Sequence, residues 1–162
     1  MLGLGIDPSL KGTGLAVVEF GVQDRVLWTG DFFLPTAKEV AEQWIAKNVY
    51  RFIDHWFPQV EFVGIEQPVA SFNAFTLIRQ ARMVGALYAF IPEVFWSKII
   101  PIAPIQTKVA LGLEKGSKKN EVVEAVCQRY GRSWVSAESS KLQVQSHADA
   151  IGVFCAARML WR

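Results

Sequence analysis

Three carboxylates stand where the surrounding pattern predicts core-facing positions. Asp7 follows the apolar run "GLGI", Glu66 follows "VGI", and Asp149 shares a helical face with Gly152 and Val153. A carboxylate buried alone is costly because it gives up water without compensation. Taken singly, Asp7 could begin a turn, Glu66 could be the first residue of a loop, and Asp149 could favour a helix N-terminus. Taken together, they predict one shared site.

The chemistry of such a site follows from its charge. Three carboxylates within a few ångströms tolerate one another only if a cation lies between them. Oxygen ligands of this kind suit Mg²⁺ or Mn²⁺. Paired ions of this type support phosphoryl transfer, in which one activates the attacking water and the other stabilises the leaving oxygen.

The predicted strands would bring two of the acids together. Alternating apolar residues and β-branched runs predict strands over 2–7, 13–20 and 25–33, joined by tight turns into an antiparallel meander. A continuous apolar run predicts a strand covered on both faces over 60–66, and another strand is expected near 98–103. If the first and fourth strands are parallel neighbours, Asp7 and Glu66 meet at the sheet edge where ligands bind.

Helical periodicity predicts five helices, over 36–57, 73–90, a short stretch after Pro104, 118–130 and 147–161. Thr36 and Glu39 form the expected capping box of the first helix, and Pro58 ends it. Asp149 is expected in the first turn of the last helix. This order of elements predicts an α/β fold with a mixed sheet, as one domain over 1–162.

The composition of the chain limits the classes of protein to which it can belong. A chain of 162 residues with 51% hydrophobic content can build a core without disulfides or a structural metal. Cys127 and Cys155 lack metal-ligand spacing, which indicates core residues in a reducing compartment.

The longest apolar stretch is broken at Pro92, too early for a membrane span, and the start lacks signal-peptide features, so we expect a cytoplasmic protein. Basic residues gather between 106 and 132, as a polyanion-binding surface or an ordinary solvated helix face.

Five motifs resemble one known family. They are "GIDPSLKGTG", "GIEQP", "NAFTLIRQARMVGAL", "KVALGLEKGSKKNEVVEAV" and "HADAIGVF". In order and approximate spacing they resemble the RuvC family of Holliday-junction resolvases, nearly from end to end. The resemblance implies a ribonuclease H-like fold, with a five-stranded mixed sheet flanked by helices.

The resemblance also implies an activity. It is a crossover junction endodeoxyribonuclease that nicks four-way DNA junctions in pairs, by attack of water on the backbone phosphate. Mg²⁺ is the implied cofactor, with Mn²⁺ as a substitute and two ions per site. The alternatives are a broader branched-DNA nuclease that also cuts forks, flaps and three-way junctions, and a non-cleaving module that binds branched DNA. The implied location is the cytoplasm of a bacterial or phage-infected cell.

By the same resemblance, Asp7, Glu66 and Asp149 fall on the catalytic, metal-binding acids of the family. The family has an Asp or His three residues before the helix Asp, where this chain has Ser146, with His147 two residues before. Two residues turn a side chain by about 200° on a helix, so His147 reaches the metals only if it precedes the first turn. Otherwise Ser146 caps the helix and His147 meets DNA or solvent. Both are candidate fourth ligands.

The resemblance also indicates DNA-binding residues. Lys108 and one of Lys118 and Lys119 fall near DNA-contacting lysines of the family. The segment after Glu66 corresponds to a loop that enters the junction, where an aromatic ring could stack on an exposed base. Its candidate DNA-binding residues are Phe72, Asn73, Phe75, Arg79 and Arg82. For one of the two phenylalanines, packing in the core is the alternative.

A homodimer is expected because a four-way junction needs two matched cuts. One chain of this length holds a single set of the three acids, so two sites need two chains. The predicted helix over 73–90 is the candidate shared surface, since its apolar residues spread beyond one narrow stripe; they are Leu77, Ile78, Ala81, Val84, Leu87 and Tyr88. The alternative is that these residues all pack against the sheet.

Overall fold

The computed structural model describes residues 1–9, 12–33, 41–69 and 73–161. The strands are β1 (Leu2–Asp7), β2 (Thr13–Glu19), β3 (Arg25–Phe32), β4 (Val60–Glu66) and β5 (Ile99–Ile102). The helices are α1 (Ala41–Ile53), α2 (Ala74–Phe90), α3 (Pro104–Ala110), α4 (Lys119–Tyr130) and α5 (Lys141–Leu160), with a 3₁₀ helix η1 over Glu93–Lys98. The predicted cap residues Thr36 and Glu39 lie outside the described residues.

The strands form one mixed sheet in the order β3-β2-β1-β4-β5. Strands β1, β2 and β3 are the predicted antiparallel meander. Strand β4 pairs with β1 and with β5 in parallel. The pairing of Ile6 with Ile65 brings the ends of β1 and β4 to the same edge, which is the condition for Asp7 and Glu66 to meet.

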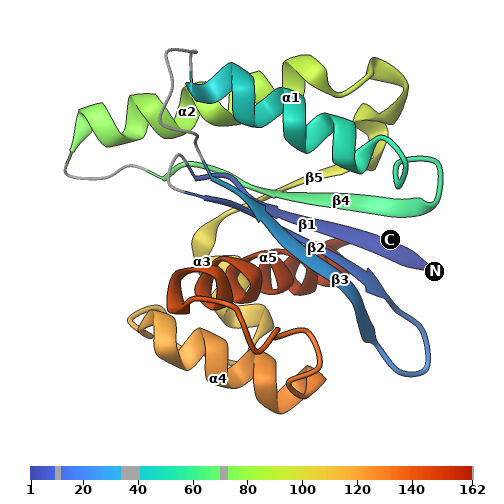
Figure 1. The fold of residues 1–162 in the computed structure, drawn as a ribbon, viewed down its shortest axis with the longest axis vertical. Helices are drawn as coiled ribbons and strands as arrows, with labels where there is room; N and C mark the ends of the chain where they lie inside the picture. The colour runs from blue at the N-terminus through green and yellow to red at the C-terminus, as the bar shows by residue number, and fades with distance from the viewer. Residues whose placement is uncertain (10–11, 34–40, 70–72, 162) are drawn as a thin grey trace.

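Helices cover both faces of this sheet (Figure 1). Helices α1 and α2 lie over one face, around a core that includes Leu4, Ile6 and Val63. Helices α3, α4 and α5 lie on the other face, around a second core that includes Phe62 and Phe154. Within the described part of the chain, no helix combines the length and apolar character needed to span a bilayer.

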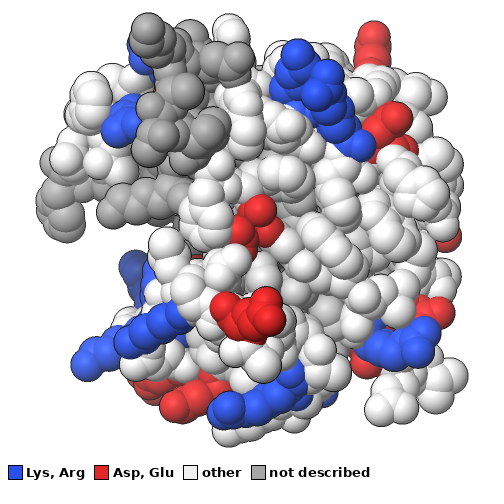
Figure 2. Space-filling model, in the orientation of Figure 1, with Lys and Arg blue, Asp and Glu red and all other residues white. Residues whose placement is uncertain are grey.

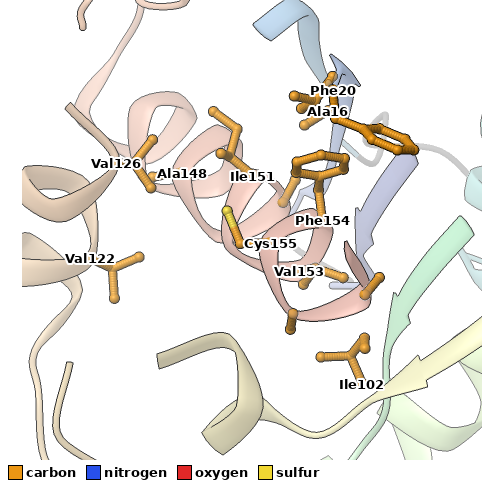
Figure 3. Packing of buried hydrophobic residues seen from close by; sticks show 14 of the residues in the cluster. Ala16, Phe20, Ile102, Val122, Val126, Ala148, Ile151, Val153, Phe154 and Cys155 are labelled. Atoms are coloured by element: carbon orange, nitrogen blue, oxygen red, sulfur yellow. The ribbon is translucent and has the colours of Figure 1, made fainter. Parts of the chain in front are cut away.

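Helix α5 is the central element of the second layer. From Ser146 to Ala157, every residue of α5 is buried except Asp149, which is partly exposed. Figure 3 shows Ile151, Phe154 and Cys155 among the packed side chains of this layer, with Val122 and Val126 of α4 beside the helix. Asp149 is thus the one side chain in this stretch that opens towards solvent.

The start of α5 differs from its prediction. The helix begins at Lys141, six residues before the expected His147. Ser140 is the N-cap: its side chain accepts from the Gln143 backbone N–H, and the Gln143 side chain accepts from the Ser140 N–H. The prediction was wrong because this capping box, readable as "SKLQ", was overlooked. Asp149 therefore lies well beyond the first turn.

The end of α1 also differs. The helix ends at Ile53, although its apolar spacing continues to Phe57. Residues 54–59 continue as turns, in which the Trp56 N–H donates to the Ile53 carbonyl and the Phe57 N–H donates to the same oxygen. A residue before proline avoids helical backbone, so Pro58 disturbs the preceding residues as well as its own position.

The close contact between α5 and the sheet yields a stability prediction. A Cβ atom at Gly5 would overlap the Ala150 carbonyl oxygen and lie 2.7 Å from the Phe154 backbone nitrogen. Gly5→Ala should therefore push α5 off β1 and lower the free energy of unfolding by about 3 kcal/mol, as overpacking does. Urea denaturation measures this. Gly21→Ala, where an added Cβ meets nothing within 4 Å, is the control; equal stability of the two variants would contradict the prediction.

Candidate active site

Three elements bring the predicted acids to one cavity. Asp7 ends β1, Glu66 ends β4, and Asp149 projects from α5. All three line a cavity of about 310 Å³ at the carboxyl edge of the parallel strands. The structure thus brings together the acids that the sequence singled out from distant positions.

The cavity lies between the two helical layers. Gln80 and Val84 of α2 line one side, and Thr107 and Lys108 of α3 line another. Figure 2 shows an indentation of the molecular surface between these layers, and charged side chains of both signs scattered over this face. Among the described residues, the basic side chains on this face therefore form no continuous surface.

Asp7 and Glu66 hold their protons more tightly than isolated carboxyls. Burial raises the pKa of Asp7 to about 7, with the Asp149 charge adding to the rise and the Lys119 charge opposing it. Burial likewise raises the pKa of Glu66 to about 8, and the charges of Asp7 and Asp149 add to it. Lys119 and a hydrogen bond from Thr107 act in the opposite direction. The positive charge of Lys119 therefore neutralises this group of carboxylates only in part.

Among the contacts of the described residues, Lys119 and Thr107 reach these acids directly. The Lys119 ammonium lies 2.9 Å from Asp149 Oδ2. The Thr107 hydroxyl donates to Glu66 Oε2 over 3.5 Å, and Thr107 is buried. Thr107 is not among the site residues that the sequence predicts, because a threonine beside a lysine in a short helix gives no pattern that separates a site residue from a packed one.

The donor set suits a hard divalent cation, since carboxylate oxygens are the ligands that such ions prefer. The Lys119 ammonium already places one positive charge against these oxygens. Within residues 1–9, 12–33, 41–69 and 73–161, no three Asp, Glu, His or Cys side chains lie close enough to hold an ion as they stand. The carboxylates of the cavity are suitable ligands for a divalent ion, but they would have to move closer together to share one.

Ser146 lies beside the acids without capping a helix. It is buried in α5, and its Oγ donates to the Gly12 carbonyl over 3.2 Å. It lines a second, smaller cavity of about 120 Å³, together with Asp7 and Asp149. The alternative that Ser146 caps the last helix is wrong, because Ser140 holds that position.

His147 points away from the acids. Its Nε2 lies 2.9 Å from Asp31 Oδ2, and its Nδ1 lies 3.2 Å from the Thr29 hydroxyl oxygen, both on β3. Burial lowers the pKa of His147, and the Asp31 carboxylate opposes this effect. Among the described residues, Asp31 Oδ2 has no hydrogen-bond partner of good geometry. His147 lies within α5, so the turn of about 200° separates it from Asp149.

The predicted DNA-binding lysines have three different surroundings. The Lys108 ammonium donates to the carbonyls of Lys115 and Ser117, at 2.8 Å each, and so holds the loop before α4. Lys118 is the exposed N-cap residue of α4, and Lys119 pairs with Asp149. Lys108 and Lys119 line the acidic cavity.

The start of α2 carries the remaining candidates. Phe72 lies outside the described residues. Asn73 is the N-cap of α2 and accepts from the backbone N–H groups of Phe75 and Thr76. Phe75 is 67% exposed, so it does not pack in the core, and the Arg79 guanidinium lies 5.7 Å from its ring centre. Arg82, one turn further along, is also exposed.

The raised pKa values predict how stability depends on pH without metal. Between pH of about 4 and about 8, the folded protein keeps protons on Asp7 and Glu66 that the unfolded chain releases near 3.8 and 4.5. Stability therefore falls as pH rises through this window. Thermal melting in EDTA should show this fall, and Glu66→Gln should melt higher than the wild type at pH 8, by roughly 2 to 4 °C per kcal/mol gained.

The control for this prediction is Glu61→Gln, which neutralises an exposed carboxylate on the same strand. It should melt like the wild type at every pH. A Glu66→Gln variant with the same pH dependence as the Glu61→Gln variant would contradict the electrostatic description of the cavity.

The chain matches one known protein family over most of its length. Residues 3–154 match the family described as crossover junction endodeoxyribonuclease RuvC. No curated protein matches the chain by sequence.

Solved structures show the same fold. The chain is similar to T. thermophilus RuvC in complex with a Holliday junction substrate, with a TM-score of 0.75 and 21% identity, covering 98% of this chain and 96% of that one. It is similar to a fowlpox virus resolvase in complex with Holliday junction DNA (TM-score 0.62, 11% identity, 100% of both chains). It is also similar to the yeast mitochondrial Holliday junction resolvase Ydc2 (TM-score 0.65, 11% identity, 98% of this chain and 78% of that one). The chain therefore belongs to the RuvC family of crossover junction endodeoxyribonucleases and has its ribonuclease H-like fold.

Proposed function

We propose that this protein is a metal-dependent endonuclease that resolves four-way DNA junctions by paired nicks. The observation that carries the proposal is the convergence of Asp7, Glu66 and Asp149 on one cavity in a chain of the RuvC family. Two of the similar structures are complexes with Holliday junction DNA, which supports branched DNA as the substrate.

Mg²⁺ is the proposed cofactor, with Mn²⁺ as a substitute and two ions per site. The RuvC family generally depends on divalent metal ions. Asp7, Glu66 and Asp149 would hold the ions through their carboxylate oxygens. The ions would supply the positive charge that activates a water molecule and stabilises the leaving oxygen. Because Ser146 donates to the Gly12 carbonyl and His147 lies against Asp31 and Thr29, the three acids carry the proposed ligation.

The other residues of the cavity would bind and orient the DNA. A phosphodiester is repelled by carboxylates, so the ammonium groups of Lys108 and Lys119 in the cavity wall favour its entry. On α2, which contributes Gln80 and Val84 to the cavity wall, the exposed Phe75 ring and the guanidinium groups of Arg79 and Arg82 suit an unpaired base and its neighbouring phosphates. We assign these residues to positioning of the DNA and the three acids to the chemistry.

Two other functions are compatible with the same fold. A broader branched-DNA nuclease would use the same acids on forks, flaps and three-way junctions. A non-cleaving module of the same fold would bind branched DNA only, and the placement of His147 away from the acids is the observation in its favour. The three acids in one cavity favour cleavage, because their mutual repulsion costs stability that binding alone does not require.

Cleavage of defined DNA substrates tests the proposal. With Mg²⁺, the protein should cut a labelled four-way junction much faster than a fork or a linear duplex of the same sequence, and EDTA should stop cleavage. A denaturing gel resolves the products. Equal rates on the junction and the fork would favour the broader nuclease. Cutting of linear duplex as fast as junction would contradict the proposal.

Substitution of the acids is the matched control in the same assay. Asp7→Asn, Glu66→Gln and Asp149→Asn should each lower the cleavage rate by at least about 100-fold, since loss of even the partners of metal ligands costs 10–100-fold. Junction binding should persist, because these changes remove metal-binding charge and leave the DNA-binding surface. Wild-type cleavage by any one variant would contradict its assignment.

We also propose that the protein acts as a homodimer that uses α2 as the shared surface. Two nicks require two sets of the acids. The outer face of α2 exposes Ile78 and Ala81, followed by Gly85, where an added Cβ would meet nothing within 4 Å. Small residues beside one large apolar side chain let two such helices approach closely. Val84 and Leu87, which the sequence also offered for this surface, are instead buried in the protein.

Light scattering coupled to size exclusion tests the dimer. The wild type should have about twice the chain mass of 18.1 kDa. Ile78→Asp places a charge in the proposed interface and should give the monomer mass. Val94→Asp, at a residue 76% exposed on η1, should remain dimeric. A wild-type mass near 18.1 kDa that persists with junction DNA would contradict the dimer.

A further inference from the structure

Lys119 is the positive charge nearest to the acids among the contacts of the described residues. It is the first residue of α4, and its ammonium lies 2.9 Å from Asp149 Oδ2. Its charge also opposes the raised pKa of Asp7 and of Glu66. Lys119 therefore acts on all three acids, although it contacts only one of them.

The side chain of Lys119 is free to leave this position. It is 66% exposed, whereas the Asp149 side chain is 18% exposed. The ammonium therefore reaches inward from solvent to a carboxylate that belongs to the cavity wall. It lines both the larger and the smaller cavity next to Asp149, so it lies at their shared border.

Lys108 provides the contrast within the same cavity. Its ammonium donates to two backbone carbonyls, those of Lys115 and Ser117, and these bonds fix the loop that leads into α4. Moving the Lys108 ammonium away would remove the two hydrogen bonds that hold this loop. Moving the Lys119 ammonium away would remove only its ion pair with Asp149. Of Lys108 and Lys119, which the described residues contribute to the cavity wall, Lys119 is the one that can leave its partner without disturbing the backbone.

We propose that Lys119 is an internal counter-ion for the acids, that a divalent ion displaces it from Asp149, and that it then contacts a DNA phosphate. The proposal rests on the proposed function. An ammonium and a divalent cation repel each other strongly at ion-pair distance, so Asp149 cannot keep both as close partners. Loading of the metal would then make Lys119 available for DNA binding, which couples the two events.

Calcium binding to the free protein tests the first half. Ca²⁺ is an oxygen-binding divalent ion and can be titrated by calorimetry without DNA. Lys119→Met keeps an apolar stem and removes the competing charge, so it should bind Ca²⁺ roughly fivefold to tenfold more tightly than the wild type, a typical size for coupled binding events. Lys115→Met removes an exposed charge from the adjacent loop and should stay within about twofold of the wild type.

If Lys119→Met bound Ca²⁺ no more tightly than Lys115→Met, the counter-ion proposal would be overturned. Thermal melting of each variant without metal shows whether it is folded. Should the Met variant be unfolded, Lys119→Gln serves in its place, since it keeps a polar side chain and removes the same charge.

The salt dependence of junction binding tests the second half. In the wild type, Ca²⁺ at matched ionic strength should steepen the slope of log K against log salt by about one unit relative to EDTA, because one further phosphate contact releases about one counterion. Lys119→Met should lack this increment, and Lys115→Met should keep it. An increment that persists in Lys119→Met would overturn the proposal.

Failure of the proposed function would look different. A protein that binds Ca²⁺ as described but cuts no junction would refute the nuclease proposal and leave the counter-ion role of Lys119 in place. A protein that cuts junctions, with Lys119→Met unchanged in both binding experiments, would refute the counter-ion role alone.

Discussion

The direct packing of α5 on the sheet is the constraint on which the site depends. Gly5 has no side chain where the Ala150 carbonyl and the Phe154 nitrogen approach β1, and Gly14 has none where the Ser146 carbonyl approaches β2. Because the backbones meet so closely, Asp149 reaches the ends of β1 and β4. The same contact seals the second core around Phe154. The packing of α5 on the sheet thus determines both the stability of the protein and the position of Asp149.

Burial of Asp7 and Glu66 lowers the stability of the folded protein near neutral pH. Burial and mutual repulsion raise the pKa of Asp7 and Glu66, so near neutral pH the carboxylates carry charge only at a cost to stability. Two apolar cores on the two faces of the sheet provide the stability that the site lacks. Lys119 and Thr107 relieve part of the cost locally. Such a conflict between local stability and charge is expected at a functional site.

The first half of α5 is fixed by polar contacts as well as by apolar packing. Ser146 bonds to the Gly12 carbonyl, and His147 pairs with Asp31 and Thr29 of β3. Ser146 and Asp149 are three residues apart and share the face towards the acids, while His147 lies on the face towards β3. These contacts set the rotation of the helix about its axis, so they determine which side chains face the cavity.

The sequence by itself determined the strands, their meander and the choice of Asp7, Glu66 and Asp149. Those features rest on local periodicity and on the cost of a carboxylate in an apolar run, which neighbouring residues reveal. Only the tertiary structure decided that His147 pairs with Asp31, that Lys108 holds a loop, that Lys119 joins Asp149, and that Val84 packs inward. Each polar contact depends on which of several possible partners lies within reach of a long or polar side chain, and the burial of Val84 depends on how α2 packs against the rest of the protein. That partner comes from a distant part of the chain, so no local pattern specifies it.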